Sequence, residues 1–240
     1  MEENNKENTT ETEKDTKQKD STEPKTIEID LDQLIAESIK EQERRLKELR
    51  TSQRDFPIIR PKTEELLKKI VIARQPNMIL ELGTCRGYSG IVMLSACPKS
   101  SLLTVERDKE NYNEAIRNFI EFDMFERTLP INGDAVEVVE KLYGSAEKPK
   151  FDLIFLDCNK SSYVKVLPLI SELLSDGGVL VADNVLYFGK VMDGKEIPDK
   201  KHRTAVVNLR KFISEVQNSP DFTNTTIYEI EDGVLVTTKK

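Results

Sequence analysis

The residues with the clearest chemical potential lie in the stretch 152-DLIFLDCNKSSY-163, where an apolar run ends on Asp157 and Lys160 follows three residues later. A continuous apolar run of this length is typical of a strand buried on both faces of a sheet. A second apolar run ends in a similar way, on Asp183 and Asn184. Ligands bind at the carboxyl ends of the strands in an open parallel sheet, so these residues are candidates for one site.

The three oxygen-bearing side chains would form a ligand set if the two strands are neighbours. Two carboxylates and an amide carbonyl, from Asp157, Asp183 and Asn184, suit a hard cation such as Mg²⁺ or Ca²⁺. A single aspartate at a strand end is more often a cap, but three oxygen ligands with Lys160 among them favour a metal site. The alternative for Lys160 is a solvated lysine at the start of a helix.

Glycines and acids also follow the other predicted strands. Gly83 and Gly87 in 81-ELGTCRGYSG-90 would let the backbone approach a ligand, although their spacing matches neither the dinucleotide nor the phosphate-loop pattern. Glu106 follows Gly83 by about 20 residues, where an acid that accepts hydrogen bonds from ribose is expected; a solvated acid at a helix start is the alternative. Asp134 is a helix cap or a contact to an adenine edge, and the two are compatible.

The elements that must position these residues alternate along the chain. Apolar strands are predicted at 78–82, 101–105, 128–132, 151–156 and 178–183, and helices at about 87–97, 109–122, 134–142 and 161–174. This alternation predicts an α/β fold, a parallel sheet with helices on both faces. Two alternating strands around Asp232-Gly233, within 225–239, predict an antiparallel hairpin, which brings the sheet to seven strands.

The N-terminal part of the chain is organised differently. Residues 1–26 contain no apolar residue after Met1, so we expect a disordered polar tail. Apolar residues at helical spacing follow from Ile27 to Leu49 with Asp30 as a candidate cap, and a second helix is predicted from about Lys62 to Arg74. We therefore predict one domain over 27–240, with N-terminal helices at 27–75 and a core at 76–240.

Composition excludes several classes of function. The formal net charge of −7 argues against a generally cationic nucleic-acid binder, and no stretch is apolar enough for a membrane span. Three cysteines, without a C-x-x-C pair, indicate reduced thiols in a cytoplasmic protein. His202 is the only histidine, which excludes Ser-His-Asp, Cys-His and multi-histidine metal chemistry, and we expect it in a solvated loop.

Four segments together carry a resemblance to a known family. They read 81-ELGTCRGYS-89, 133-GDA-135, 152-DLIFLDCNKSSY-163 and 178-GVLVADNVLYFGKV-191. In this order and spacing they resemble the metal-dependent O-methyltransferases, which include the caffeoyl-CoA and catechol O-methyltransferases. The resemblance covers about residues 55–240 and implies the Rossmann-like fold of the class I methyltransferases. The stretch 56-FPIIRPKTEELL-67 is most similar to the bacterial branch that methylates 5-hydroxyuridine at the tRNA wobble position.

The resemblance also implies roles for individual residues. S-adenosylmethionine would be held by Glu81, Gly83, Tyr88, Ser89, Glu106, Asp134, Ala135 and Asp157. Mg²⁺, or another divalent cation such as Ca²⁺, would be held by Asp157, Asp183 and Asn184, with Lys160 and Asp157 as the catalytic residues. The family usually reads Asp-Ala-Asp-Lys where this chain has 157-DCNK-160, and losing the second acid would lower the negative charge of the site.

The sequence leaves the acceptor open. Residues 40–74 hold eleven basic and six acidic residues, an excess that fits an RNA-binding face and equally an ordinary solvated helix face. The basic residues are Lys40, Arg44, Arg45, Lys47, Arg50, Arg54, Arg60, Lys62, Lys68, Lys69 and Arg74. A tRNA and a small catechol-like compound are both candidate acceptors. The alternative class for the protein itself is a non-catalytic protein that binds the cofactor. We expect the protein to be a homodimer. Tyr163 and Arg210 could line the acceptor pocket, although Tyr163 packed on a helix is the simpler interpretation.

Overall fold

The structure, a computed structural model, describes residues 30–191 and 200–240. The chain divides into two units, residues 1–41 and 42–240. Helix α1 (Leu31–Ser52) begins in the first unit, where the Asp30 carboxylate accepts a hydrogen bond from the Gln33 backbone N–H at 3.0 Å. The predicted cap is therefore confirmed. The polar tail predicted for residues 1–26 lies outside the described residues.

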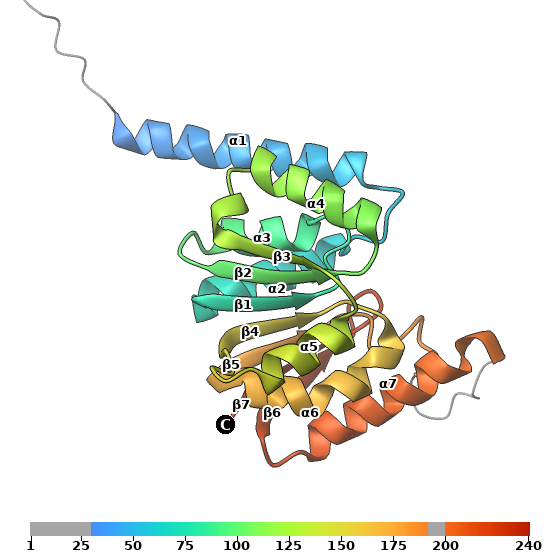
Figure 1. The fold of residues 1–240 in the computed structure, drawn as a ribbon. Helices are drawn as coiled ribbons and strands as arrows, with labels where there is room; N and C mark the ends of the chain where they lie inside the picture. Colours follow the sequence, from blue (N-terminus) through green and yellow to red (C-terminus); the bar gives the residue numbers. More distant parts are fainter. Residues whose placement is uncertain (1–29, 192–199) are drawn as a thin grey trace, which may run out of the picture. The chain divides into compact units, whose positions relative to one another are not determined.

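The second unit alternates helices and strands, as Figure 1 shows. After α1, its helices are α2 (Pro61–Arg74), α3 (Tyr88–Ala96), α4 (Lys109–Glu121), α5 (Ala135–Gly144), α6 (Tyr163–Leu173) and α7 (Lys200–Asn218). Its strands are β1 (Met78–Leu82), β2 (Ser101–Glu106), β3 (Thr128–Asn132), β4 (Phe151–Leu156), β5 (Leu174–Ala182), β6 (Phe222–Tyr228) and β7 (Val234–Lys239). Two short 3₁₀ turns, η1 (Phe125–Arg127) and η2 (Lys160–Ser162), precede β3 and α6.

The strands form one seven-stranded sheet in the order β3-β2-β1-β4-β5-β7-β6. Strands β1 to β5 pair in parallel, while β7 pairs antiparallel with both β5 and β6. The predicted parallel sheet with a C-terminal antiparallel hairpin is confirmed. The strand order reverses direction between β1 and β4, which is the point where open α/β sheets bind their ligands.

Alternate residues of the central strands pack against helices on opposite faces of the sheet. Ile154 and Leu156 share a buried cluster with α5, α6 and α7, whereas Leu153 and Phe155 share another with α2, α3, α4 and the buried Leu46 of α1. All four of these β4 side chains are fully buried. A strand buried on both faces must be apolar throughout, which explains the continuous run that precedes Asp157.

Two parts of the sequence prediction differ from the structure. Helix α7 was not predicted, although its buried residues Val206, Leu209, Phe212 and Val216 recur at helical spacing. His202 lies in this helix rather than in a loop, and its Nδ1 is 3.1 Å from the Tyr187 hydroxyl.

None of the described helices is long and apolar enough to cross a membrane. The predicted division between residues 75 and 76 stays a prediction.

Candidate active site

The ends of β4 and β5 bring Asp157 and Asp183 to neighbouring positions at the carboxyl edge of the sheet. The ladder continues just past the strands, because the Asp157 N–H donates to the Leu82 carbonyl and the Asp183 N–H to the Leu156 carbonyl, both at 2.9 Å. The next residue, Asn184, has a φ of +54°, a left-handed conformation that asparagine tolerates better than most residues. Its N–H donates to Asp183 Oδ1 at 2.7 Å. The structure thus brings the three predicted metal ligands to one place.

Burial makes negative charge costly at this edge. Only 3% of the Asp183 surface is exposed, and burial together with the nearby Asp157 carboxylate raises the pKa of Asp183 to about 7. Burial also raises the pKa of Asp157, although the Lys160 ammonium opposes the shift. Two buried carboxylates that repel each other are stabilised by a cation between them, so the charge pattern fits a divalent ion.

Lys160 belongs to this buried cluster and is not a solvated surface residue. Its side chain is only 14% exposed, and its Nζ donates to Asp157 Oδ1 at 2.9 Å and to the Tyr163 hydroxyl at 3.0 Å. Lys160 is the first residue of the turn η2, which lies between β4 and α6. The same turn brings Tyr163 into the core, where its side chain is fully buried, so the interpretation of Tyr163 as a packing residue is confirmed.

Asn159, the departure from the family pattern, serves the turn itself. Its Oδ1 accepts hydrogen bonds from the Ser161 backbone N–H at 3.1 Å and from the Ser161 hydroxyl at 3.0 Å. Asn159 is exposed and lies beside a different cavity from the one that Asp157 and Asp183 line. Its change from aspartate therefore removes charge from the cap of η2, not from the carboxylate pair.

A cavity of ≈ 290 Å³ opens beside the carboxylate pair. Its lining residues include Asp157, Lys160, Asp183, Asn184, Pro57, Ile58, Arg60, Tyr187, Phe188 and Asp232. Arg60 and Asp232 face each other with Nη2 and Oδ2 3.4 Å apart. Sequence reasoning missed both as site residues, because Arg60 counted only as a basic charge and Asp232 only as a hairpin turn. No local pattern signals that the β6–β7 turn reaches this edge.

A second cavity of ≈ 260 Å³ lies beside the ends of β1, β2 and β3. Its lining includes Gly83, Glu106, Asp134 and Ala135, four of the predicted cofactor residues. Glu106 is fixed by two backbone donors, the Cys85 and Asp108 N–H groups, each at 2.8 Å from a different carboxylate oxygen.

Asp134 and Gly83, which also line this cavity, have conformational roles in the structure. Asp134 caps α5, accepting from Val136 N at 2.9 Å, which confirms the cap interpretation. Gly83 has a φ of +109°, and a Cβ there would lie 2.4 Å from the Asp157 carbonyl oxygen, so only glycine fits.

Glu81 and Ser89 belong to a buried hydrogen-bond network with Thr104. Glu81 is fully buried at the end of β1, and its two carboxylate oxygens accept hydrogen bonds from the Ser89 and Thr104 hydroxyls. Burial raises the pKa of Glu81 to about 7, against these two favourable hydrogen bonds. Neither Glu81 nor Ser89 is among the residues that line the cavity, so their direct contact with a cofactor stays a prediction.

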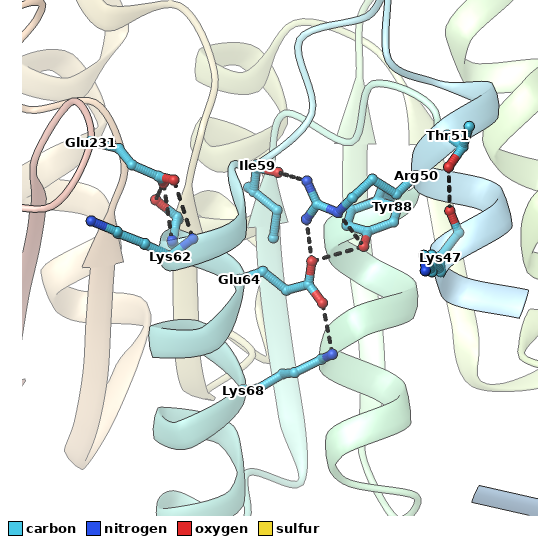
Figure 2. A network of polar contacts seen from close by, with 10 residues as sticks. Lys47, Arg50, Thr51, Ile59, Lys62, Glu64, Lys68, Tyr88 and Glu231 are labelled. Carbon is cyan, nitrogen blue, oxygen red and sulfur yellow. Dashed lines mark hydrogen bonds and ion pairs between the residues drawn. The ribbon is translucent and has the colours of Figure 1, made fainter. Parts of the chain in front are cut away.

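Tyr88 is likewise not among the residues that line the second cavity, and its hydroxyl forms hydrogen bonds with other helices. Its hydroxyl lies between Arg50 and Glu64 (Figure 2). It accepts a hydrogen bond from Arg50 Nε at 3.0 Å and donates one to Glu64 Oε2 at 2.8 Å. Lys68 completes the network with an ion pair of 2.7 Å to Glu64. The Tyr88 hydroxyl therefore ties the first residue of α3, next to the Gly83 loop, to α1 and α2. Its predicted cofactor contact stays a prediction as well.

Arg210 lies on α7 and donates from Nε and Nη2 to the backbone carbonyls of Val191 and Lys190, each at 3.2 Å. It holds the segment that follows Phe188, a residue of the first cavity. Arg210 is not among the residues that line that cavity, so the structure gives it a supporting position.

The sheet order and the two cavities at its carboxyl edge define a methyltransferase-like α/β architecture. A family model described as O-methyltransferase matches residues 31–240, and the chain belongs to this family. A catechol O-methyltransferase from Niastella koreensis is 32% identical over 155 residues, which cover 64% of this chain and 67% of that protein.

Two solved structures extend the similarity. A Staphylococcus aureus protein provisionally named a caffeoyl-CoA O-methyltransferase is 25% identical, with a TM-score of 0.74 over 87% of this chain and 98% of that one. The O-methyltransferase TomG from Streptomyces achromogenes, solved in complex with SAM, is also 25% identical, with a TM-score of 0.70 over 81% of this chain and 89% of that one. The fold and the O-methyltransferase family implied by the sequence motifs are confirmed, while the metal dependence and the tRNA branch stay predictions.

Proposed function

We propose that this protein is an S-adenosylmethionine-dependent, divalent-cation-assisted O-methyltransferase, and that its acceptor is 5-hydroxyuridine at the wobble position of tRNA. One observation carries the reaction class: the turn 157–160 separates two cavities. Cys158 and Asn159 line the cavity beside Glu106, whereas Asp157 and Lys160 line the cavity beside Asp183. A methyl donor on one side and an acceptor on the other would meet across this turn.

The cavity beside Glu106 suits the adenosine part of the donor. The Glu106 carboxylate is held by two backbone donors and has further lone pairs for ribose hydroxyls. Gly83 and the N-terminus of α5 bring backbone close to the same space. TomG was solved with SAM, and its similarity supports the same donor here. S-adenosylmethionine supplies an activated methyl group, so the protein has mainly to orient donor and acceptor.

The carboxylate pair would hold the cation. Within the described residues, no group of three or more His, Cys, Asp and Glu side chains is arranged to hold a metal ion. Coordination would therefore rest on Asp157, Asp183 and the Asn184 amide oxygen, with acceptor or solvent oxygens completing it. A divalent cation bound there would lower the pKa of the acceptor hydroxyl.

Lys160 is the residue placed to manage the acceptor's proton. Lys160 is among the residues that line the acceptor cavity, where a neutral amine could accept the hydroxyl proton and an ammonium could stabilise the oxyanion. The oxygen then attacks the methyl carbon, a C–O bond forms as the S–C bond breaks, and neutral S-adenosylhomocysteine leaves. The proton passes to Lys160 or to solvent, so the reaction needs no oxidant or reductant.

Two side chains at the cavity support a nucleotide acceptor. Phe188 is 64% exposed and could stack on a pyrimidine, while the exposed Arg60 could contact a phosphate. In 5-hydroxyuridine the hydroxyl at C5 and the carbonyl at C4 form the neighbouring oxygen pair. Lys47, Arg54 and Lys62 are further exposed basic residues.

The predicted basic face is smaller than its sequence count suggests. Arg45 donates to the Glu121 carbonyl, Arg74 to the Gly177 carbonyl, and Arg50 belongs to the network of Figure 2. These three guanidinium groups have structural roles, so RNA binding would depend on the exposed remainder.

A small catechol-like acceptor is the second candidate. The relative from Niastella koreensis is named a catechol O-methyltransferase, and Pro57, Ile58 and Phe188 give the cavity an apolar rim on which an aromatic ring could rest. A catechol offers the same pair of neighbouring oxygens, so the carboxylate pair and Lys160 would act on it in the same way.

The deciding experiment measures methyl transfer from labelled S-adenosylmethionine to two acceptors, before and after chelation. The first is tRNA from a strain that lacks this protein, followed by nucleoside mass analysis, and the second is protocatechuate. We expect label in the wobble nucleoside, lost with EDTA and restored by Mg²⁺. Transfer that survives thorough chelation would remove the cation from the proposal. Transfer to protocatechuate alone would replace tRNA with a small acceptor.

A variant pair sharpens the acceptor assignment. Arg60→Ala should reduce transfer to tRNA by about 10-fold, the usual scale for a charged hydrogen bond, and leave transfer to protocatechuate nearly unchanged. Arg117→Ala, which removes a 71% exposed side chain from α4, is the matched control and should affect neither.

A further inference from the structure

The Tyr163 hydroxyl occupies the junction between the two strand ends that carry the carboxylates. Tyr163 is the first residue of α6, and its side chain is fully buried. Its Oη lies 2.7 Å from the Leu156 carbonyl oxygen, 3.0 Å from the Asp183 carbonyl oxygen and 3.0 Å from Lys160 Nζ. One hydroxyl therefore contacts the end of β4, the end of β5 and the lysine.

The direction of these hydrogen bonds is fixed by chemistry. Carbonyl oxygens only accept, so the single Tyr163 hydrogen is shared between Leu156 and Asp183. The Tyr163 oxygen is then left to accept from Lys160 Nζ. Burial raises the pKa of Tyr163 well above its ordinary value, so the group stays an O–H donor over the working range of pH.

Lys160 needs this second acceptor. Its only other hydrogen-bond acceptor given by the described residues is Asp157 Oδ1, at 2.9 Å. Under the proposed function Asp157 is a metal ligand, and a cation would compete with the ammonium for its oxygens. Tyr163 would then be the contact that keeps the long, flexible lysine side chain facing the acceptor cavity.

Ring packing does not account for the hydroxyl. The Tyr163 ring meets the Phe212 ring edge-on, with centroids 5.2 Å apart, within an apolar cluster that a phenylalanine would fill equally well. A hydroxyl in this position costs desolvation unless it is fully hydrogen-bonded. Here it is bonded to the three groups that build the site.

We propose that Tyr163 is a positioning residue for methyl transfer: its hydroxyl, fixed by the backbone carbonyls at the ends of β4 and β5, sets the Lys160 amine at the acceptor cavity. This inference rests on the proposed function. Tyr163 lines neither cavity, so it acts through Lys160 and touches neither donor nor acceptor.

The test is a double-mutant cycle on Tyr163→Phe and Lys160→Ala. Single-turnover methyl transfer is followed with tritiated S-adenosylmethionine, Mg²⁺ and protocatechuate, or 5-hydroxyuridine-containing tRNA where protocatechuate accepts no label. S-adenosylhomocysteine affinity is measured by calorimetry, and thermal unfolding reports the fold. Tyr228→Phe, which removes a hydroxyl from the partly exposed strand β6, is the matched control.

We expect Tyr163→Phe to slow transfer by about 10- to 100-fold, the scale of a misplaced catalytic group, with S-adenosylhomocysteine affinity unchanged within about 2-fold. In the Lys160→Ala background the same substitution should change the rate by less than about 2-fold, because the residue through which it acts is gone. The Tyr228→Phe control should match the wild-type protein.

The outcomes separate this inference from the proposed function. Wild-type turnover in Lys160→Ala would overturn the proposed role of the lysine, and this inference with it. An impaired Lys160→Ala with a normal Tyr163→Phe would overturn only the inference. Equal slowing by Tyr163→Phe in both backgrounds would do the same, since it would show that the hydroxyl maintains the fold and not the lysine.

Discussion

The carboxyl edge of the sheet has two halves, the ends of β2 and β3 and the ends of β4 and β5, and the acidic side chains have different environments in each. At the ends of β2 and β3, Glu106 and Asp134 are partly exposed, and each accepts hydrogen bonds from two backbone N–H groups. At the ends of β4 and β5, Asp183 is buried and Asp157 is half-buried. Asp157 has Lys160 as its partner, and Asp183 has one N–H donor, from Asn184.

This difference in environment indicates which kind of ligand each half can bind. A carboxylate satisfied by backbone donors is already stabilised, and its spare lone pairs suit neutral hydroxyls such as those of a ribose. Two largely buried carboxylates with few hydrogen-bond donors repel each other, and this arrangement favours the binding of a cation. Under the proposed function, the first half would position the cofactor, and the second half would concentrate charge for the chemistry.

The largest effect should come from the chemical half. Lys160→Ala should lower turnover by roughly 10²–10⁴, the usual scale for losing a general acid-base group. S-adenosylhomocysteine affinity, measured by calorimetry, should stay within about 2-fold, because the cofactor half is unchanged. A variant with normal turnover, or one that loses cofactor affinity along with turnover, would break the separation between the halves.

Glu81 lies between the halves and predicts a pH-dependent stability. Its folded pKa of about 7 lies above the ordinary value of 4.5, so the folded state binds the proton more tightly than the unfolded chain. The proton bound to Glu81 therefore stabilises the folded state. This stabilisation is complete below pH 4.5 and is lost as the pH rises to about 7, a change on the order of 3 kcal/mol in the free energy of unfolding.

Urea unfolding of the ligand-free protein between pH 4.5 and 8 checks this prediction. Glu81→Gln carries no titrating proton, so its free energy of unfolding should fall less steeply over this window than that of the wild-type protein. Parallel curves for the two proteins would show that Glu81 does not titrate abnormally.

Sequence patterns predicted which residues lie at the carboxyl edge of the sheet better than they predicted the side-chain contacts made there. Asp157, Asp183 and Glu106 lie at the ends of apolar runs, and strand-helix alternation alone predicted that these ends share one edge of a parallel sheet. Arg60 and Asp232 reach the site through loops distant in sequence, and no period encodes such contacts. The inward direction of Tyr88 depends on Arg50 and Glu64, which come from two other helices. Tertiary packing decides these orientations, so local sequence could not predict them.

A smaller effect should separate the cofactor half. In Glu106→Gln the side chain keeps its shape but offers one acceptor oxygen for the Cys85 and Asp108 N–H groups, so one donor is left unsatisfied. We expect S-adenosylhomocysteine affinity to fall by about 10- to 100-fold, the scale of a hydrogen bond to a charged group. Turnover at saturating donor should change far less, which steady-state kinetics can measure.

The smallest effect should come from Asn159→Asp, which restores the acid that the family usually has. The side chain at this position caps η2 through Ser161 and lies beside the cofactor cavity, so a carboxylate can keep both hydrogen bonds without joining Asp157 and Asp183. We expect the Mg²⁺ concentration for half-maximal turnover to change by less than about 3-fold, because the added charge acts through partly solvated space. A gain of 10-fold or more would mean that residue 159 reaches the cation, and the turn 157–160 would then have to rearrange when the cation binds.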